Sequence, residues 1–289
     1  MIQGAPLPPH VIDEAVLAAL EEDAAHNDVT TAAVLAPGQW GRGAFIAKTA
    51  GVIAGLPVAA AAMTALDEDV SFDTLVAEGH QVIAGTTIAE VEGQLAAILA
   101  CERVALNFLQ RLSGIATLTR DFVDAVQDTN AVILDTRKTT PGLRVLERYA
   151  VRAGGGRNHR FALADGILIK DNHIEASKQD GTPHLGDIVR QVRKSAPHTL
   201  RIEIECTDDE QVAQALEGGA DVILLDNMDV EAIRAALRVI DGRAQVEASG
   251  GITLANVAEI ARTGVDFISI GRLTHSAPAL DISLDISTV

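Results

Sequence analysis

The stretches RIEIE at residues 201–205, VILLD at 222–226, AQVEA at 244–248 and FISIG at 267–271 decide the fold of this chain. Each is a short run of mainly aliphatic residues, and a stretch of helical character separates it from the next run. Two similar runs come earlier, at residues 131–135 and 166–170. Because strands that alternate with helices form parallel sheets, this repeat predicts an α/β fold.

A polar residue or a glycine stands at or just beyond the end of each run. In a barrel the carboxyl ends of all strands meet at one mouth, so residues far apart in the sequence would come together there. A doubly wound open sheet is the competing architecture, and we rank it second because it gathers ligand groups mainly at one switch point. The residues at these ends are Asp135, Thr136, Arg137, Lys138, Lys170, Glu205, Asp226, Glu247, Ser249 and Gly271.

The first part of the chain has a different pattern. Residues 41–47, 69–77 and 86–92 show the short alternation of half-buried antiparallel strands, and residues 95–112 show helical periodicity that we expect to end at Ser113-Gly114. We therefore predict three parts. They are an N-terminal domain with its linking helix at 1–114, a barrel domain at 115–275, and a C-terminal segment at 276–289 that returns to the first domain.

Composition excludes several classes of function. The chain has 289 residues, a net charge of -17 and only 3% aromatic residues, which argues against nucleic acid as a partner. We see no secretory signal at the N-terminus, and the most apolar run, residues 55–66, is too short to cross a bilayer, so we expect a cytoplasmic protein. Cys101 and Cys206 lie far apart and are expected to be buried, unreactive thiols.

Positive charge is concentrated between Arg137 and Lys170. This segment holds eight Lys and Arg residues against two acidic ones, although the whole chain is acidic. The concentration predicts a pocket for a small polyanion. We expect Arg137, Lys138, Arg160 and Lys170 to line the pocket, since they lie in loops or at strand ends. We expect Arg144, Arg148 and Arg152 to be solvated charges on a helix face.

Two strand ends have the form of phosphate sites. Ser249-Gly250-Gly251 follows one strand and precedes Thr253, which could cap a helix over residues 254–262, and the next strand closes at Gly271. Loops after the last two strands of a barrel often bind phosphate. Thr140-Pro141 has the pattern of another helix start, directly after the cationic Arg137-Lys138 pair.

Glu205 and Asp226 would lie on neighbouring strands. Two carboxylates that face a polyphosphate commonly hold Mg²⁺, partly through water. The alternative is that they neutralise Lys138 or Lys170. Glu203 shares a strand face with Glu205 and is expected to be a supporting, hydrogen-bonded group deeper in the barrel.

The ordered set of motifs resembles the quinolinate phosphoribosyltransferase family, also called nicotinate-nucleotide pyrophosphorylase, and the resemblance covers nearly the whole chain. The motifs in the second half are DTRKTTPGLR at 135–144, AGGGRNHR at 153–160, LIKDNHI at 168–174, EIE at 203–205, LDNM at 225–228, EASGGI at 247–252 and GRLTHS at 271–276. Those in the first half are DVTT at 28–31, AKTAGV at 47–52 and CERVALN at 101–107.

The resemblance implies a fold and a reaction. The fold would be an N-terminal α/β sandwich followed by an incomplete TIM-like α/β barrel. The reaction would join quinolinate to phosphoribosyl pyrophosphate with Mg²⁺, giving nicotinate mononucleotide, pyrophosphate and CO₂ in de novo NAD synthesis. It also implies a homodimer with shared active sites, possibly assembled into a hexamer.

The resemblance further assigns roles to residues. Arg103 would reach the partner's site, and Lys138, Glu205 and Asp226 would contact the ribose and pyrophosphate, the two carboxylates with Mg²⁺. The quinolinate clamp would be Arg137, His159, Arg160 and Lys170. The 5-phosphate would lie on Ser249, Gly250, Gly251, Gly271 and His275.

Some positions depart from the family pattern, and other functions stay open. Arg272 stands beside the phosphate turn where a small residue is usual, Ala153 precedes the glycine triplet where a Cys is more familiar, and residues 179–183 are expected to form a surface loop. A nicotinate-specific transferase or a transport-associated homologue would lose part of the clamp. A phosphate-ligand sensor or a Schiff-base lyase is a second class, but a lyase needs its lysine in an apolar pocket.

Overall fold

The computed structural model describes residues 5–177 and 184–288, so the loop predicted at 179–183 lies outside the described residues. The chain forms two compact units. Unit 1 contains residues up to Arg120 together with Lys138–Gly156 and Arg272–Val289, and unit 2 contains Asp121–Arg137 and Arg157–Gly271. The chain therefore crosses between the units several times.

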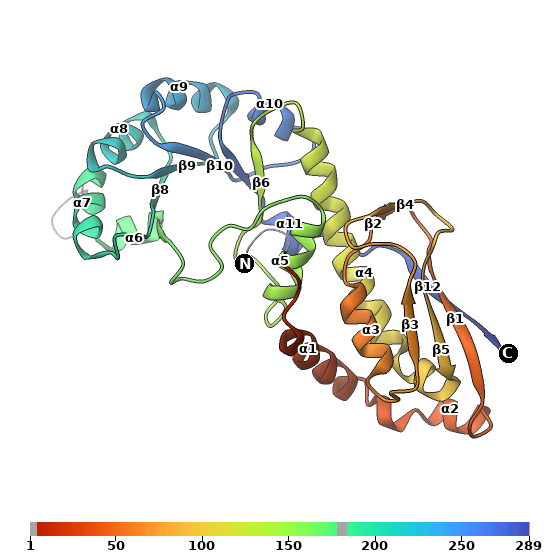
Figure 1. Cartoon of the computed structure of the whole chain (residues 1–289). Coiled ribbons are helices and arrows are strands. Elements are labelled where there is room, and N and C mark those ends of the chain that lie inside the picture. The colour runs from red at the N-terminus through yellow and green to blue at the C-terminus, as the bar shows by residue number, and fades with distance from the viewer. Residues whose placement is uncertain (1–4, 178–183, 289) are drawn as a thin grey trace. The chain divides into compact units, whose positions relative to one another are not determined.

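Unit 1 is built on an antiparallel sheet in the order β12-β1-β5-β3 (Figure 1). The strands are β1 (Trp40–Ala47), β3 (Ser71–Thr74), β5 (Thr87–Gln94) and β12 (Ile282–Thr288). The three strands predicted from alternation are present, with shorter bounds for β3. The C-terminal strand β12 pairs with β1 along its length, which ties the end of the chain to this unit.

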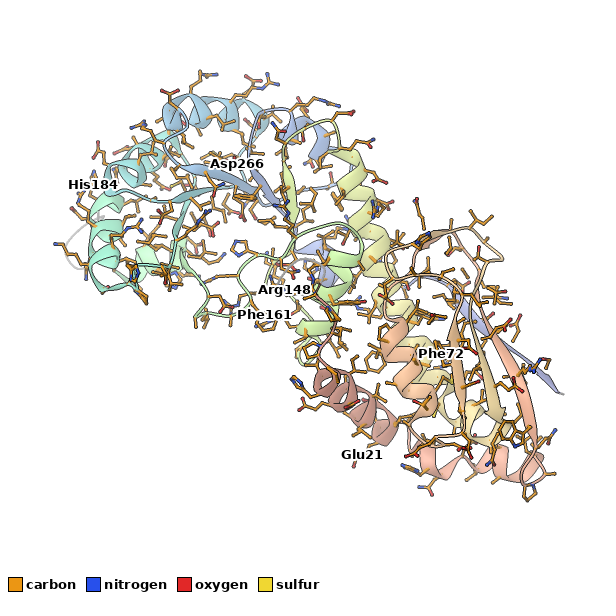
Figure 2. All side chains as sticks on the ribbon, viewed as in Figure 1. Glu21, Phe72, Arg148, Phe161, His184 and Asp266 are labelled. Carbon is orange, nitrogen blue, oxygen red and sulfur yellow. The ribbon has the colours of Figure 1, made fainter. Side chains whose placement is uncertain are left out.

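Alternation in β1 explains its place in the sheet. Phe45 and Ala47 are fully buried, whereas Ile46 between them is half-buried. The Phe45 ring meets the edge of the Phe72 ring at a centroid distance of 5.5 Å (Figure 2 labels Phe72). This cross-sheet aromatic pair helps to fix the strand register in unit 1.

Helices and two short strands complete unit 1. Pro9 begins α1 at a position where a missing N–H has no cost, and Asp28 caps α2 by accepting from the N–H groups of Thr30 and Thr31. The remaining bounds are α1 (Pro9–Glu22), η1 (Ala25–Asn27), α2 (Val29–Val34), β2 (Gly51–Val52), α3 (Leu56–Thr64), β4 (Gln81–Val82), α5 (Arg144–Ala153) and α11 (Arg272–His275).

The long helix α4 (Leu95–Ala125) does not end at Gly114, so that prediction was wrong. Gly114 allows α4 to pack closely against the backbone at Pro278, because a Cβ at this position would stand 1.9 Å from the carbonyl oxygen of Pro278. Ser113 is fully buried, and its hydroxyl accepts from the N–H of Ala54 at 3.0 Å. The Ser-Gly pair that looked like a helix stop is instead a packing contact inside unit 1.

Helix α5 begins at Arg144 rather than at Pro141, which corrects the second predicted helix start. Gly142 has φ +82°, a left-handed conformation that interrupts a helix, and Thr140 uses its hydroxyl to donate to Glu147. The expectation of solvated charges on this helix was also wrong for Arg148 and Arg152, whereas Arg144 is half-buried. Arg148 is fully buried (labelled in Figure 2) and Arg152 is buried, with one N–H donated to the carbonyl of Ala5.

Unit 2 is a parallel sheet in the order β6-β11-β10-β9-β8-β7. Consecutive strands from β7 to β11 are neighbours, and β11 then pairs with β6, the first strand of the series. This is the strand order of a barrel that is left open between its first two strands, β6 and β7, and it excludes the doubly wound order. The strands are β6 (Val132–Leu134), β7 (Ile167–Ile169), β8 (Ile202–Cys206), β9 (Val222–Asp226), β10 (Gln245–Ser249) and β11 (Phe267–Ser269).

Helices lie outside the strands of unit 2 (Figure 1). Asp208 and Asp229 cap two of them, each accepting from a backbone N–H three residues later. Their apolar faces, such as Val212 and Ile233, are buried against the sheet. The helices are α6 (Asp171–Ala176), α7 (Leu185–Ser195), α8 (Asp209–Gly218), α9 (Val230–Ile240) and α10 (Val257–Ala261).

Both cysteines are buried and neither is in a disulfide. Within residues 5–177 and 184–288, we find no helix with the length and apolar character that a membrane crossing requires.

Candidate active site

The inner face of the sheet in unit 2 carries polar side chains at three levels. Glu205 on β8 and Glu247 on β10 both pair with Leu224 of the intervening strand, so the two carboxylates stand at the same height on one face. Glu203 lies one level deeper, and Asp226 and Ser249, which pair with each other, lie one level nearer the strand ends. The parallel register therefore gathers residues from three strands on one face, as the sequence predicted.

A buried cluster joins His159 to Glu203, at the deepest level, and to Glu247, one level nearer the strand ends. The Nε2 atom of His159 lies 3.2 Å from an oxygen of Glu203 and 3.5 Å from an oxygen of Glu247. The two glutamates are 8% and 2% exposed. Each has a second carboxylate oxygen, Oε1, that is buried without a hydrogen-bond partner among the described residues.

Two observations on His159 point to different protonation states of its ring. Burial lowers the pKa of His159, but the hydrogen bonds and charges of Glu203 and Glu247 outweigh burial and raise it to about 10. That would protonate both ring nitrogens, whereas Nδ1 accepts the backbone N–H of Arg160 at 2.7 Å and needs a lone pair. Burial also raises the pKa of Glu203. A ring with its proton on Nε2 fits the contacts at both nitrogens, as a donor toward the carboxylates and as an acceptor at Nδ1.

The segment that carries His159 is anchored on Asp135. This carboxylate is fully buried and accepts from the side-chain amide of Asn158 at 2.5 Å and from the backbone N–H of His159 at 2.9 Å. Arg157 extends the sheet, because its N–H donates to the carbonyl of Ile133 on β6 at 2.8 Å. Asp135 therefore fixes the open edge of the barrel beside β6.

Arg137 and Arg160 bring two guanidinium groups into this part of unit 2. The pKa of Arg160 is lowered by burial and by the positive charge of Arg137, and the charge of Glu203 opposes this. Arg160 donates from Nη1 to the carbonyl of Gly166 at 2.9 Å. The Nε atom of Arg137 is buried and has no hydrogen-bond partner in the described part of the chain. Two cations that repel each other, one with an unsatisfied donor, favour binding of an anion.

Lys170 and Glu205 form an ion pair at the end of the strands. The Lys170 Nζ atom lies 3.4 Å from a Glu205 oxygen, and its side chain is 47% exposed. Burial raises the pKa of Glu205, the charge of Lys170 lowers it, and the charge of Asp226 raises it again. The neighbouring Asp226 carboxylate accepts from the side chain of Asn227 at 2.6 Å. Lysine here is half exposed and paired, unlike a lysine held in an apolar pocket.

The turn after β10 requires glycine at positions 250 and 251, where the backbone has a positive φ. Gly250 has φ +84°, and a Cβ there would stand 2.3 Å from the side-chain oxygen of Asn227. Gly251 also has a positive φ. The helix predicted over 254–262 begins only at Val257, because the Asn256 side chain accepts from the N–H of Thr253 and forms a turn first. Backbone N–H groups of the turn, rather than a helix start, are thus the donors available there.

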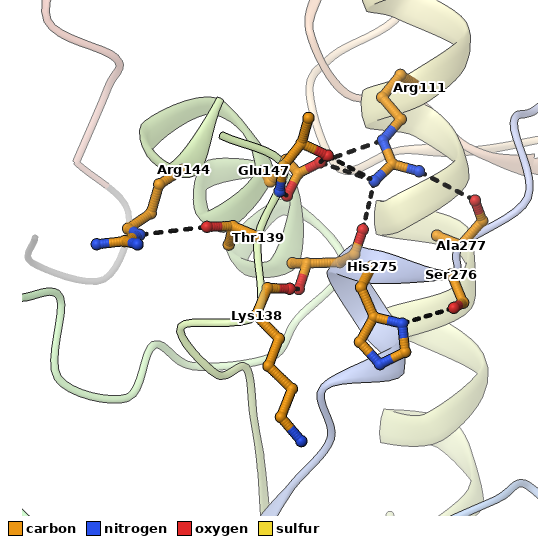
Figure 3. A network of polar contacts seen from close by, with 10 residues as sticks. Arg111, Lys138, Thr139, Arg144, Glu147, His275, Ser276 and Ala277 are labelled. Carbon is orange, nitrogen blue, oxygen red and sulfur yellow. Dashed lines mark hydrogen bonds and ion pairs between the residues drawn. The ribbon is translucent and has the colours of Figure 1, made fainter. Parts of the chain in front are cut away.

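Lys138, His275 and Arg103 belong to unit 1. Arg103 is an exposed residue of α4, and Lys138 is an exposed residue whose backbone carbonyl accepts from the hydroxyl of Thr274 at 2.7 Å (Figure 3). His275 follows Thr274 in α11, and its Nδ1 atom lies 2.6 Å from the hydroxyl of Ser276.

A network around Arg111 supports this part of unit 1 (Figure 3). Arg111 is paired with the fully buried Glu147 at 2.7 Å and donates to the carbonyls of Ala277, at 3.1 Å, and Thr274. Glu147 also accepts from the backbone N–H of Thr140 at 3.0 Å. The network joins the turn that follows Lys138 to the segment that carries His275.

Comparison with known proteins gives the family. The C-terminal domain of quinolinate phosphoribosyl transferase matches residues 115–285, and the N-terminal domain of the same family matches residues 28–113. The chain belongs to the quinolinate phosphoribosyltransferase family.

Individual relatives of the quinolinate phosphoribosyltransferase family align over nearly the whole chain. A probable nicotinate-nucleotide pyrophosphorylase (carboxylating) of Bacillus subtilis is 44% identical over 92% of this chain and 90% of its own length. A quinolinate phosphoribosyltransferase (decarboxylating) of Nicotiana glauca is 39% identical over 97% of this chain and 84% of its own. The solved nicotinate-nucleotide pyrophosphorylase of Francisella tularensis is 34% identical, with a TM-score of 0.91 over 99% of this chain and 100% of its own.

The residues that the sequence predicts for the active site are distributed over the two units. Unit 2 holds all four residues of the predicted clamp, both carboxylates and the glycine turn, and their roles stay predictions. Unit 1 holds the other three. Those in unit 2 are Arg137, His159, Arg160, Lys170, Glu205, Asp226, Ser249, Gly250, Gly251 and Gly271, and those in unit 1 are Arg103, Lys138 and His275.

Sequence reasoning missed the supporting residues of this family member. Asp135 and Glu247 were noted only as strand-end residues and as the first residues of two motifs. Arg111 and Glu147 were not singled out at all. A signal existed for the acidic ones, because each stands in or beside an apolar run where an unpaired carboxylate would be unfavourable.

Proposed function

We propose that this chain transfers the phosphoribosyl group of phosphoribosyl pyrophosphate to quinolinate with loss of CO₂, giving nicotinate mononucleotide and pyrophosphate in NAD biosynthesis. Besides family membership, the main support for this proposal is the pair of neighbouring guanidinium groups of Arg137 and Arg160 in unit 2. Arg137 has a buried donor that finds no partner among residues 5–177 and 184–288, and the pKa of Arg160 is lowered by burial and by Arg137. A pyridine with two adjacent carboxylates would supply the missing acceptors and the missing negative charge.

The proposed quinolinate clamp consists of Arg137, Arg160 and Lys170, with His159 as the fourth member predicted from the sequence. Guanidinium forks match carboxylate geometry, so two arginines can hold the 2- and 3-carboxylates and aim the ring nitrogen at C1 of the ribose. Lys170 adds a cation at the strand ends, where Glu205 keeps it in place.

The proposed ribose and pyrophosphate contacts are Lys138, Glu205 and Asp226. Breaking the bond to pyrophosphate leaves positive charge on the ribose, which the carboxylates stabilise, and negative charge on the leaving group, which Lys138 stabilises. Glu205 and Asp226 also fit Mg²⁺. Their negative charges repel each other, which a cation would relieve, and both offer the hard oxygen ligands that this ion prefers. Bound there, the ion would neutralise charge on the pyrophosphate.

The 5-phosphate is proposed to lie on the turn of Ser249, Gly250 and Gly251 with Gly271 and His275. Left-handed glycines let the backbone approach the phosphate closely and point N–H groups at it. After the ring nitrogen is alkylated, the ring is cationic and accepts the electrons of the C2–carboxylate bond, so CO₂ leaves without a covalent enzyme intermediate.

Assembly and location are part of the proposal. We infer a homodimer in which Arg103 completes the partner's quinolinate site; this residue is exposed on α4 and is therefore available to a second subunit. Assembly into hexamers and a cytoplasmic location stay predictions from the sequence.

Steady-state turnover with two acids tests the proposed specificity. The purified protein with Mg²⁺ and phosphoribosyl pyrophosphate should consume quinolinate and leave nicotinate essentially unchanged, because nicotinate lacks the 2-carboxylate. Equal turnover of the two acids would reject the dicarboxylate clamp. Omission of phosphoribosyl pyrophosphate is the control, and it should abolish consumption of quinolinate.

A further inference from the structure

Asn227 directly follows the last residue of β9 and has an uncommon backbone conformation. Its φ is +55°, in the left-handed region, where residues with a side chain are seldom found. Within residues 5–177 and 184–288, the other non-glycine residues with a positive φ are Ala24 and Asp241. Asparagine tolerates this region better than most residues, and proteins retain such conformations where they place a functional group.

The left-handed conformation brings the side chain of Asn227 onto that of its neighbour. In an extended strand successive side chains point to opposite faces, so residues 226 and 227 would not meet. Here the amide Nδ2 of Asn227 donates to Oδ2 of Asp226 at 2.6 Å. A hydrogen bond to a charged acceptor is about twice as strong as a neutral one. This bond therefore restricts the orientation of the Asp226 carboxylate.

The turn after β10 contacts the same amide. A Cβ at Gly250 would stand 2.3 Å from Oδ1 and 2.6 Å from Cγ of Asn227, so the amide lies directly against the backbone of the turn. The backbone N–H of Asn227 donates to the carbonyl of Ser249 at 2.9 Å. Ser249 is also paired with Asp226 in the sheet. Both the main chain and the side chain of Asn227 are thus fixed against the turn.

We propose that Asn227 is a positioning residue that orients the Asp226 carboxylate toward the ribose, with the turn of residues 249–251 as its support. The inference rests on the proposed function and extends it. One side chain ties the carboxylate that meets the ribose to the turn that meets the 5-phosphate, and both groups belong to the same substrate.

The charges of the site make this orientation necessary. The charge of Asp226 raises the pKa of Glu205, because the two carboxylates repel each other. Without the amide, this repulsion favours a position of Asp226 farther from Glu205. The donor of Asn227 opposes the displacement by holding Oδ2 at the turn. Asn227 is itself exposed, so its loss should disturb the carboxylate rather than the core.

Two substitutions of Asn227 test the donor, and a third change tests the backbone. Asn227→Gly removes the amide but still permits a φ of +55°. Asn227→Asp keeps the size and replaces the donor with an oxygen that repels Asp226. Asp241→Gly is the matched control, because Asp241 is an exposed residue of unit 2 with a φ of +47°, at the C-terminal end of α9.

The expected result is a selective loss of affinity for phosphoribosyl pyrophosphate. Its binding, measured by calorimetry with Mg²⁺, should weaken about tenfold or more in both Asn227 variants. The KM for quinolinate should stay within about threefold of the wild type, and both constants should do so in Asp241→Gly. Unchanged binding in Asn227→Gly would overturn the proposal. An equal loss of affinity for both substrates would also overturn it.

A double-mutant cycle separates positioning of Asp226 from an independent contact. In the Asp226→Ala background, Asn227→Gly should weaken binding by less than about threefold, since the carboxylate that it orients is absent. A loss as large as in the wild-type background would show that Asn227 acts without Asp226, against the proposal. Thermal unfolding establishes that each variant is folded, and Asn227→Asp takes the place of Asn227→Gly in the cycle if the glycine variant is not. A wild-type protein that binds phosphoribosyl pyrophosphate but does not consume quinolinate would instead contradict the proposed function.

Discussion

Arg137 illustrates how single residues of this chain are prepared for an anion. Its Nε atom is buried without a partner in the part of the chain that the structure describes, and a second guanidinium stands near it. An unsatisfied buried donor costs about 1–3 kcal/mol, and a carboxylate that accepts from it recovers this free energy on binding. Part of the affinity for an anion therefore comes from a hydrogen bond that Arg137 Nε makes to the bound ligand.

Arg137→Lys should raise the KM for quinolinate about tenfold or more, because lysine keeps the charge but loses the planar fork that matches a carboxylate. Arg201→Lys is a matched control in the same unit. Arg201 precedes the first residue of β8, whereas Glu205 of the proposed site lies near the last, so this change should leave the KM unchanged. Kinetics of Arg137→Lys like those of the wild type would remove Arg137 from the clamp.

The two cysteines allow a prediction about reactivity. Burial raises the pKa of Cys101 to about 11 and that of Cys206 to about 12, so the thiolate is nearly absent at neutral pH. Iodoacetamide at pH 8 should leave the native protein unmodified, whereas the protein unfolded in guanidinium should take up two groups, one for each Cys. Rapid alkylation of the native protein would show that a thiol is accessible.

At the scale of elements, helix α4 depends on a glycine that helix propensity would disfavour. An alanine at an ordinary helix-interior glycine stabilises by about 1 kcal/mol. At Gly114 a Cβ would stand 1.9 Å from the carbonyl of Pro278. Gly114→Ala should therefore lower the free energy of unfolding by about 1–3 kcal/mol through overpacking, measured by urea denaturation. An increase in stability would mean that the close contact is absent.

The hydroxyl of Thr274 is one of the groups that join helix α11 to the segment after β6. Thr274 donates to the carbonyl of Lys138 at 2.7 Å, and Arg111 donates to the carbonyl of Thr274 (Figure 3). Thr274→Val keeps the shape and removes this bond, so kcat/KM for phosphoribosyl pyrophosphate should fall about 2- to 12-fold. Thr263→Val removes a similar hydroxyl bond in unit 2, to the carbonyl of Ile260, and should leave kcat/KM intact. Equal effects of the two changes would contradict a positioning role for Thr274.

For the whole molecule, the proposed exchange of Arg103 between subunits can be tested by mixing. Arg103→Ala and Arg137→Ala should each be nearly inactive. If each site uses Arg103 of one subunit and Arg137 of the other, half of the dimers from equal co-expression are mixed, and each has one intact site. The mixture should then show about a quarter of wild-type activity. Failure to recover activity would place both arginines in one subunit's site.

Much of the architecture could be predicted because it depends on local patterns. The six parallel strands and the antiparallel strands β1 and β5 follow from alternation and aliphatic runs. The misplaced boundaries depend on contacts between distant residues. Gly114 reads as a helix stop until Pro278 lies against it, and Arg148 reads as a surface charge until the surrounding chain buries it.

The same division holds for the site. Residue types at strand ends predicted which groups would gather, since parallel strands share one carboxyl end. The sequence could not reveal that Asp135 is buried beneath the His159 segment, or that Glu203 and Glu247 converge on one ring from different strands. Those arrangements arise only when the sheet curves and the register is fixed.

Release of labelled CO₂ tests the central claim most directly. Quinolinate labelled in its 2-carboxylate should release one CO₂ for each nicotinate mononucleotide formed, and only when phosphoribosyl pyrophosphate and Mg²⁺ are both present. Release of CO₂ without phosphoribosyl pyrophosphate, or product that retains the label, would contradict the account.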